Sequence, residues 1–346
     1  MRLSDFDYHL PKEFIAQHPK SPRDHSKLMA LDRATLAITH HQFFELPELL
    51  DPQSVLVFNN SKVIPARLEF KWGQGKAEIL LLKPITPTTW ECLVRPGEKF
   101  FVGAHQSIDS ELSFQVKEMR SGVRVIEFNC PDFKAYLKTH GHVPTPPYIK
   151  EPVRNPDEYQ TIYAKPEGSV AAPTAGFHFT ERVFESLKAK GIQTEFITLH
   201  VGLGTFQPVK TEDITQHPIH SEWFELSSDV ADRLNQAKAA GKRIVAVGTT
   251  SVRVLEFCAA SAGDSHPELG SGSRLQARCG ETNLFIYPGY TFKFVDQMIT
   301  NFHVPKSSLL MLVSAFAGRE FILEAYELAK QKQYRFFSFG DAMWIH

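Results

Sequence analysis

The stretch Arg243-Ile-Val-Ala-Val-Gly-Thr-Thr-Ser-Val-Arg253 indicates the fold class of this chain. Its first half, Arg243–Gly248, is a run of small and β-branched apolar residues, which is typical of a buried strand. The following Thr249-Thr-Ser251 leads directly into apolar residues at helical spacing as far as Cys258, which predicts a helix. A strand that passes at once into a helix is the unit from which α/β proteins are built.

The same alternation of strands and helices recurs on both sides of this stretch. A polar or hydroxyl residue starts most of the helices and a glycine follows several of them, as is usual at helix ends. Strands are predicted at Lys27–Asp32, Leu36–His40, Ser54–Asn59 and Gln193–Val201, and helices from Thr180 to Gly191, from Ser227 or Ser228 to Gly241, at Ser307–Gly318 and at Glu320–Lys332. The pattern predicts an α/β domain with a mostly parallel sheet.

Residues 61–130 show a different pattern, in which short strands are separated by turn residues without a helical period. The predicted strands are Val63–Phe70, Ala77–Leu82, Trp90–Val94, Leu112–Val116 and Val123–Phe128. This spacing predicts an inserted antiparallel β-barrel-like domain. A proline-rich segment, Pro144–Pro156, marks the return to the first pattern. We therefore predict an α/β catalytic domain of residues 1–60 and 154–346, interrupted by a β-rich domain of residues 61–153.

Composition indicates a globular protein with an ordinary core. The chain has 346 residues, 42% of them hydrophobic, and a formal net charge of −1. Its four cysteines form no Cys-x-x-Cys pair, which suits a reducing compartment. The first residues lack the apolar core of a signal peptide, and the most apolar run, Leu309–Ala317, is too short to span a bilayer. We expect a cytoplasmic, monomeric protein without a membrane partner.

Two segments rich in small residues, Gly168–Thr180 and Leu199–Pro208, are the strongest candidates for a binding site. Glycine and alanine let the backbone approach a ligand closely, and the polar side chains between them, His178 and His200 among others, can form hydrogen bonds. The alternative is that both segments are tight turns between strands and helices, with the histidines bonded to backbone. The residues alone leave both interpretations open.

The turn from strand to helix at residues 247–253 offers free helix N–H groups, three hydroxyls and an arginine. Such a helix start attracts phosphate or carboxylate groups. The alternative is that Thr250 or Ser251 merely caps the helix. His217-Pro-Ile-His220 and His40-His41 do not have the spacing of metal ligands, so we expect no metal site. The residues from 61 to 150 include 13 Lys and Arg against 9 Asp and Glu, which makes this region mildly basic.

Long motifs along nearly the whole chain resemble the S-adenosylmethionine:tRNA ribosyltransferase-isomerase family of queuosine biosynthesis. They are Asp7–Pro11, Ile15–Pro19, Arg23-Asp24, Val57–Arg67, Pro146–Ile149, Tyr159–Ala164, Gly168–Thr180, Leu199–Val209, His220–Leu226, Val247–Leu255, Phe285–Gly289, Val295–His303, Leu310–Gly318 and Tyr334–Met343. The sequence departs from the family at Ser61, where threonine is common, and at Gln276–Asn283, where Gly-Trp-Thr-Asp is more usual. The second departure leaves open any role of the family's tryptophan or aspartate.

The resemblance implies a transfer of the ribosyl group of S-adenosylmethionine to 7-aminomethyl-7-deazaguanine at the wobble position of tRNA. The ribose is isomerised to the epoxycyclopentanediol of epoxyqueuosine, and adenine and methionine leave. S-adenosylmethionine is then a consumed substrate, and no cofactor is implied. Two alternatives are an S-adenosylmethionine-dependent RNA methyltransferase and a non-catalytic RNA-binding adaptor. The adaptor is disfavoured because it would not require the glycine-rich polar segments.

Residue types within the matching motifs suggest roles for this reaction. We predict His178 as the general base that removes a proton beside the sulfonium, with His200, Glu222, Asp296 and His303 as alternatives. Glu222 or Asp296 is also a candidate to read the deazaguanine. The predicted S-adenosylmethionine contacts are Gly202, Gly204, Thr205 and Phe206 for the adenosine, and Thr249, Thr250, Ser251 and Arg253 for the methionine carboxylate. The predicted contacts to tRNA phosphates are Lys62, Arg67 and Arg95.

Overall fold

A computed structural model describes residues 1–120, 122–151, 153, 155–202, 209, 211–217, 219–260 and 274–346. The chain divides into two compact units. Unit 1 comprises Met1–Lys62, Pro147–Pro166 and Ala172–His346, and unit 2 comprises Val63–Pro146 and Glu167–Ala171. These edges differ from the predicted insert of residues 61–153. Residues 147–151 group with unit 1, where Gln17 donates to the Tyr148 carbonyl and accepts from the Lys150 N–H.

A nine-stranded sheet with the order β15-β13-β12-β3-β14-β16-β17-β1-β2 forms the centre of unit 1. Its strands are β1 (Lys27–Leu31), β2 (Ile38–Gln42), β3 (Ser54–Asn59), β12 (Gln193–Leu199), β13 (Glu222–Leu226), β14 (Arg243–Val247), β15 (Arg278–Thr282), β16 (Gln297–Asn301) and β17 (Ala342–Ile345). The four strands β12, β3, β14 and β16 are parallel to their neighbours in this group. All six residues of β3 are buried, as expected for a strand covered on both faces.

The prediction of a mostly parallel sheet is only partly right, because antiparallel strands flank the parallel centre. β13 pairs antiparallel with both β12 and β15 on one side, and β17 pairs antiparallel with β16 on the other. β17 then pairs in parallel with β1, which forms the predicted hairpin with β2. Unit 1 is therefore an α/β unit with a mixed sheet. The short strand β17 lies between segments from opposite ends of the sequence and joins them into one sheet.

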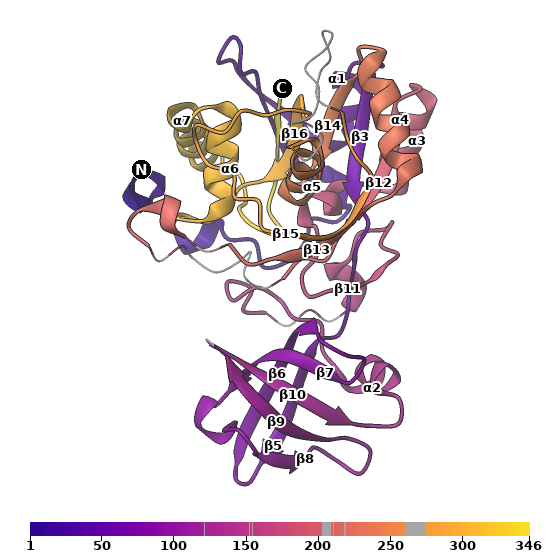
Figure 1. Ribbon diagram of the computed structural model, residues 1–346. Helices are drawn as coiled ribbons and strands as arrows, with labels where there is room; N and C mark the ends of the chain where they lie inside the picture. The colour runs from indigo at the N-terminus through magenta and orange to yellow at the C-terminus, as the bar shows by residue number, and fades with distance from the viewer. Residues whose placement is uncertain are drawn as a thin grey trace. The chain divides into compact units, whose positions relative to one another are not determined.

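Helices of unit 1 other than α1, which was not predicted, begin and end close to the predicted positions, and Figure 1 shows where they lie. The helices of this unit are α1 (Leu46–Leu49), α3 (Glu181–Ala189), α4 (Ser228–Ala239), α5 (Thr249–Ala260), α6 (Ser308–Ala317) and α7 (Arg319–Gln331). Thr180 caps α3 by accepting from the Val183 N–H, and Ser307 caps α6 by accepting from the Leu310 N–H. In the described part of the chain, no helix combines the length and apolarity that crossing a bilayer requires.

Aromatic and aliphatic side chains from the sheet and from α3 form a core of unit 1. Phe58 of β3 is fully buried and contacts the rings of Phe179, Phe184 and Phe196 at centroid distances of 4.8 to 5.5 Å. Fully burying one such side chain contributes about 1.5–3 kcal/mol. This packing holds the segment after Ala172 against the parallel strands, and so fixes the residues that line the cavity described below.

Unit 2 contains an antiparallel sheet with the order β5-β6-β7-β10-β9-β8 (Figure 1). Its strands are β5 (Arg67–Trp72), β6 (Gly75–Pro84), β7 (Thr89–Arg95), β8 (His105–Ser107), β9 (Ser113–Arg120) and β10 (Val123–Asn129), accompanied by α2 (Phe133–His140). The short strands β4 (Lys62–Val63) and β11 (Glu167–Ser169) pair separately. Antiparallel pairing agrees with the prediction, whereas β8 and α2 were not predicted.

The sheet of unit 2 curls around an aromatic core, as in a barrel. Three strands separate β5 from β9 in the sheet order, yet Phe70 and Trp72 of β5 both contact Phe114 of β9. The rings of Phe100 and Phe128 complete this cluster. Two strands that are distant in a sheet meet in this way only when the sheet bends back on itself.

Candidate active site

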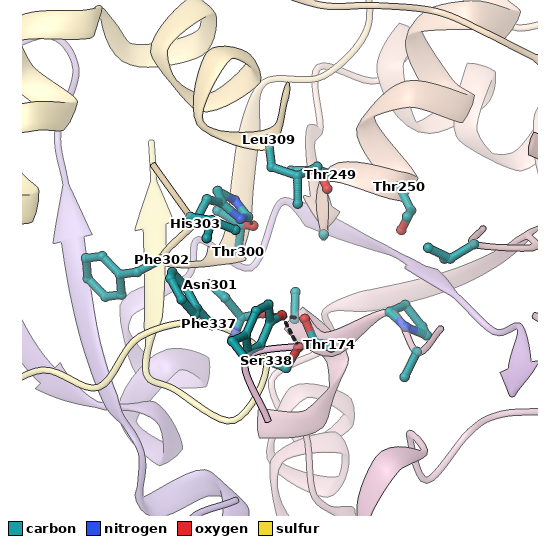
Figure 2. A pocket seen from close by; sticks show the side chains of 17 residues that line it. Thr174, Thr249, Thr250, Thr300, Asn301, Phe302, His303, Leu309, Phe337 and Ser338 are labelled. Atoms are coloured by element: carbon teal, nitrogen blue, oxygen red, sulfur yellow. Dashed lines mark hydrogen bonds between the residues drawn. The ribbon is translucent and has the colours of Figure 1, made fainter. Parts of the chain in front are cut away.

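A cavity lies at the carboxyl ends of the parallel strands of unit 1 (Figure 2). It encloses about 550 Å³ of empty space, part of which is open to solvent. Its walls are Tyr148, Ala172, Pro173, Thr174, Ala175, Val201, Gly248, Thr249, Thr250, Thr300, Asn301, Phe302, His303, Val304, Leu309, Phe337 and Ser338. Ligands of open α/β sheets bind at this edge, because the loops that follow the strands diverge there. We call this space the hydroxyl cavity.

The small residues at the end of β14 bring the backbone close to the cavity wall. Gly248 has a φ of +87°, a conformation that favours glycine, and a Cβ there would lie 3.5 Å from both Ala175 and Thr250 Oγ1. Ala172 to Ala175 form the facing wall. Four residues from the middle of the segment Gly168–Thr180 therefore line a cavity, and the binding role of the segment stays a prediction.

The hydroxyl cavity is lined by hydroxyl groups and carries no ionic side chain. Of the described residues in its wall, none is lysine, arginine, aspartate or glutamate. The polar groups are instead the side chains of Tyr148, Thr174, Thr249, Thr250, Thr300, Asn301, His303 and Ser338. Tyr148 and Ser338 are hydrogen-bonded to each other, with their oxygens 2.7 Å apart. Such a wall suits a weakly hydrated cation or a nucleoside better than a free carboxylate.

His303 supplies the imidazole of this cavity. Its Nε2 lies 3.1 Å from Thr300 Oγ1, and no protein group among the described residues bonds to its Nδ1. The Tyr326 hydroxyl accepts from its backbone N–H, and the Tyr8 hydroxyl donates to its carbonyl oxygen. Burial lowers the pKa of His303 to about 3, so the ring is neutral near pH 7. The unbonded nitrogen of this neutral ring is available to accept a hydrogen bond from a ligand in the cavity.

His178, the predicted general base, lies behind the cavity wall. Only 3% of its surface is exposed, and it is not among the lining residues. Its Nδ1 lies 2.7 Å from Ser26 Oγ and its Nε2 lies 3.1 Å from Asn301 Nδ2, so both ring nitrogens are used. Burial, followed by the positive charges of Arg335 and Arg23, lowers its pKa to about 3. Geometry therefore favours His303 over His178 for contact with a ligand.

The predicted threonine and serine contacts at the start of α5 separate into two groups. Thr249 and Thr250 line the hydroxyl cavity, and the buried Thr250 Oγ1 has no hydrogen-bond partner among the described residues. Ser251 is fully buried and donates to the Val247 carbonyl oxygen at 2.8 Å. Thr249 and Thr250 are thus available to a ligand, whereas Ser251 stabilises the turn.

Arg253 and Glu222 line a second, adjacent space, which we call the ion-pair cavity. Its walls are His217, Ile219, His220, Glu222, Arg253, Leu284, Phe285, Ile286, Ser308, Leu309 and Leu312. Arg253 forms a buried ion pair with Glu222 and donates through Nε to the Leu284 carbonyl oxygen at 3.1 Å. Glu222 Oε1 accepts from the Gly202 N–H at 2.9 Å. Because Glu222 neutralises the guanidinium, Arg253 is a poor site for the methionine carboxylate that the sequence suggested.

Asp296 lies at the opposite end of the sheet from the hydroxyl cavity. Both of its carboxylate oxygens lie 2.7 Å from Lys238 Nζ, and one also accepts from the Ile244 N–H. The residue precedes β16, whereas the cavity begins at Thr300 of that strand, roughly 13 Å further on at about 3.3 Å per residue. This position excludes Asp296 from direct contact with a ligand in the cavity.

The remaining predicted site residues are dispersed. His200 stacks on Trp223 at 5.0 Å, burial lowers its pKa, and its Nδ1 has no partner within the described part of the chain. Gly204, Thr205 and Phe206 lie outside the described residues. Of the predicted tRNA contacts, Lys62 and Arg67 are half-buried, and Arg95 is exposed on β7.

Thr174, Thr300, Asn301 and Ser338 are cavity residues that the sequence interpretation did not single out. Asn301 ends the largely buried strand β16, after the apolar pair Met298 and Ile299, and a polar residue at a strand end is a usable signal because strand ends carry the site in α/β sheets. Thr174 lies within the predicted binding segment Gly168–Thr180, whereas nothing local distinguishes Ser338 from other turn residues. Within the described ranges, no group of three His, Cys, Asp or Glu side chains gathers as around a metal ion.

A cavity formed by loops at the carboxyl edge of a mixed α/β sheet places the chain in the broad class of small-molecule-binding α/β proteins. The sequence model of the queuosine biosynthesis proteins matches residues 3–345, and the chain belongs to this family.

Relatives and a solved structure agree with this placement. The chain is 49% identical over 352 residues to the S-adenosylmethionine:tRNA ribosyltransferase-isomerase of Desulfitobacterium hafniense, and 50% identical over 351 residues to the protein of that name from Moorella thermoacetica. Both alignments cover 100% of both chains. The crystal structure of S-adenosylmethionine tRNA ribosyltransferase from Thermotoga maritima is similar over 99% of this chain and 100% of that one, with 39% identity and a TM-score of 0.56.

Proposed function

We propose that this protein is an S-adenosylmethionine:tRNA ribosyltransferase-isomerase of queuosine biosynthesis. The observation that carries the proposal is identity at about half of all positions, over the full length of both chains, with relatives of that name. The reaction transfers the ribosyl group of S-adenosylmethionine to 7-aminomethyl-7-deazaguanine in tRNA and isomerises it. Epoxyqueuosine-tRNA, adenine and methionine are the products.

The hydroxyl cavity is the proposed site for S-adenosylmethionine. Its apolar walls and hydroxyl groups suit an adenosine with a neighbouring sulfonium, since neither needs a fixed counter-charge to be bound. Thr249 and Thr250 remain proposed contacts. Arg253 and Ser251 are withdrawn from direct contact, because protein groups already occupy their donors.

His303 is the proposed general base. The hydrogens on the carbon beside the sulfonium are acidified, and a neutral imidazole in the same cavity is able to remove one. Thr300 Oγ1, at 3.1 Å from Nε2, would accept the proton on that nitrogen and so leave the Nδ1 lone pair directed at the substrate. We propose no additional cofactor, and we expect turnover to persist when a chelator is present.

Unit 2 is proposed to contact tRNA, with Arg95 as the best-placed of the predicted residues. Its bounds contain 11 Lys and Arg against 10 Asp and Glu, so the net basic excess is small. Several of these cations are paired, including Arg120 with Glu118 and Glu91. Arg95 is exposed, and the described residues offer it no ion pair. Replacing Arg95 with glutamine should make the slope of log tRNA affinity against log salt concentration shallower by about one, which corresponds to the loss of one phosphate contact.

A product assay tests the proposed function. The protein is incubated with S-adenosylmethionine and tRNA that carries the precursor base, and with tRNA that carries guanine at the same position as a control. Free adenine and methionine with the first tRNA alone support the proposal. S-adenosylhomocysteine as the product would indicate methyl transfer instead, and the absence of turnover would contradict an enzymatic role.

A further inference from the structure

Four side chains form a continuous chain of hydrogen bonds from the hydroxyl cavity into the core. Thr174 Oγ1 donates to Asn301 Oδ1 at 3.0 Å, and Asn301 Nδ2 lies 3.1 Å from His178 Nε2. His178 Nδ1 lies 2.7 Å from Ser26 Oγ. Thr174 and Asn301 line the cavity, whereas His178 and Ser26 are buried behind it. Thr174 and Asn301 are both labelled in Figure 2.

The donors of this chain all point in one direction. The Asn301 amide nitrogen has only hydrogens to offer, so His178 Nε2 must be the acceptor. The single proton of the neutral imidazole then resides on Nδ1, from which it is donated to Ser26 Oγ. A ring that carried protons on both nitrogens would break this order, and the buried position of His178 disfavours that state. Hydrogen bonds aligned head to tail also strengthen one another.

The consequence at the cavity is that Thr174 has no proton left for a ligand. Its one hydroxyl hydrogen is committed to Asn301, so the oxygen presents only lone pairs to the cavity. Thr250 differs, since its hydroxyl has no partner among the described residues and is free to donate or accept. In a wall without carboxylates, an oxygen restricted to acceptance favours a ligand group that is positively charged.

We propose that Thr174 is the acceptor for the positively charged part of S-adenosylmethionine, and that His178 is a positioning residue that holds Thr174 in this state through Asn301. The charge belongs to the sulfonium or to the ammonium group of the same molecule. This inference rests on the proposed function, because S-adenosylmethionine is the ligand that brings the charge.

Equilibrium binding tests the role of Thr174. Affinities are measured with tRNA carrying guanine at the wobble position, so that no turnover occurs, for S-adenosylmethionine, S-adenosylhomocysteine and 5′-methylthioadenosine. Thr174→Val should weaken S-adenosylmethionine about 10-fold or more, because it removes either a hydrogen bond donated by the ammonium group or an oxygen contact to the sulfonium, which has no hydrogen to donate, whereas Thr174→Ser should retain affinity. If the variant loses affinity for S-adenosylmethionine alone, the sulfonium is the group that contacts Thr174. If it loses affinity equally for S-adenosylhomocysteine, which has the ammonium group but no sulfonium, the ammonium is that group. Equal losses for all three ligands, or none, would overturn the proposal.

A double-mutant cycle tests the role of His178. His178→Ala should weaken S-adenosylmethionine to an extent similar to Thr174→Val, and should add almost nothing when Thr174 is already valine. Losses that simply add would show that His178 does not act through Thr174. Ser26→Ala removes the last acceptor with a smaller change of volume, and should show the same non-additivity if His178→Ala does not fold.

Different results would contradict the proposed function and the proposed role of Thr174. Wild-type protein that neither binds S-adenosylmethionine with tRNA nor releases adenine would contradict the proposed function. An active wild type whose affinity is unchanged by Thr174→Val would contradict this inference alone.

Discussion

The hydroxyl cavity and the ion-pair cavity differ in what their polar groups are bonded to. In the ion-pair cavity, Arg253, Glu222 and the backbone satisfy one another. In the hydroxyl cavity, Thr250 Oγ1 and one nitrogen of His303 have no partner among the described residues. A buried polar atom without a partner is costly, which is why such atoms tend to mark places where a ligand binds. Of the two cavities, the hydroxyl cavity is therefore the one whose polar groups are left for a ligand to bond.

Loss of the His303 imidazole should have the largest effect that this contrast predicts. His303→Gln should lower kcat by about 10²–10⁴-fold, as is typical of a positioned base, with little change in S-adenosylmethionine affinity. His217→Gln in the ion-pair cavity is the matched control, with kcat expected to stay within about threefold of wild type, since only the hydroxyl cavity is proposed to hold the reacting carbon. Adenine release under saturating substrates measures both. Near-normal kcat in the His303 variant would move the base to another residue.

Separation of the buried ion pair should affect stability rather than binding. Arg253→Met removes the cation that neutralises the buried Glu222 carboxylate, which should cost about 3–5 kcal/mol in the free energy of unfolding. The double variant Arg253→Met with Glu222→Gln should recover part of this loss. Urea unfolding measures the effect, and titration with S-adenosylmethionine at low temperature measures binding. A folded Arg253 variant with unchanged stability and much weaker binding would reverse the roles of the two cavities.

The buried histidines predict a loss of stability in mild acid. Burial lowers the pKa values of His178 and His303 to about 3 in the folded protein, whereas an unfolded histidine has a pKa of about 6.5. The unfolded chain therefore binds more protons between these values, and stability falls as the pH drops from about 6.5 towards 3. Each histidine contributes up to about 1.4 kcal/mol per pH unit. Urea midpoints from pH 7 to 5 should fall less steeply in His303→Gln, and an unchanged slope would contradict the neutral state of that ring.

Removal of two hydroxyl groups at the start of α5, those of Thr250 and Ser251, should have the smallest effects. The two changes should shift the stability of the free protein in opposite directions. Thr250→Val removes a buried oxygen without a partner and should stabilise the free protein by about 1 kcal/mol, while weakening S-adenosylmethionine binding. Ser251→Ala removes the bond to the Val247 carbonyl oxygen and should cost about 1 kcal/mol without affecting binding. Thermal unfolding with and without ligand distinguishes the two. A destabilised Thr250→Val would show that its hydroxyl is satisfied.

The local elements of unit 1 were predictable because their signals are local. The strand β14 and the helix α5 follow from a continuous apolar run and a helical period, and glycine ends α3 as expected. The position of β17 was not predictable, because a four-residue strand carries little pattern and its partners β16 and β1 are distant in sequence. The mixed character of the sheet depends on that pairing.

The site was predicted only in part, because the partners of its residues are also distant in sequence. Residue type suggested His178 as a base, but only the tertiary structure shows that Ser26 and Asn301 occupy both of its nitrogens. The pairing of Arg253 with Glu222, 31 residues apart, likewise changes an expected anion site into an internal ion pair. Small residues before His178 did indicate a cavity wall. Glycine and alanine permit close backbone approach because their side chains are absent or small, and this can be read from the sequence.

The position of β17 also bears on how the chain folds while it is being synthesised. The hairpin of β1 and β2 is among the first segments to leave the ribosome, yet it joins the sheet only through β17, the last strand in chain order. Until residues 342–345 emerge, the apolar edge of β1 has no partner on that side. Unpaired apolar edges promote association between chains, so chains that lack these last residues should associate more readily than the complete protein.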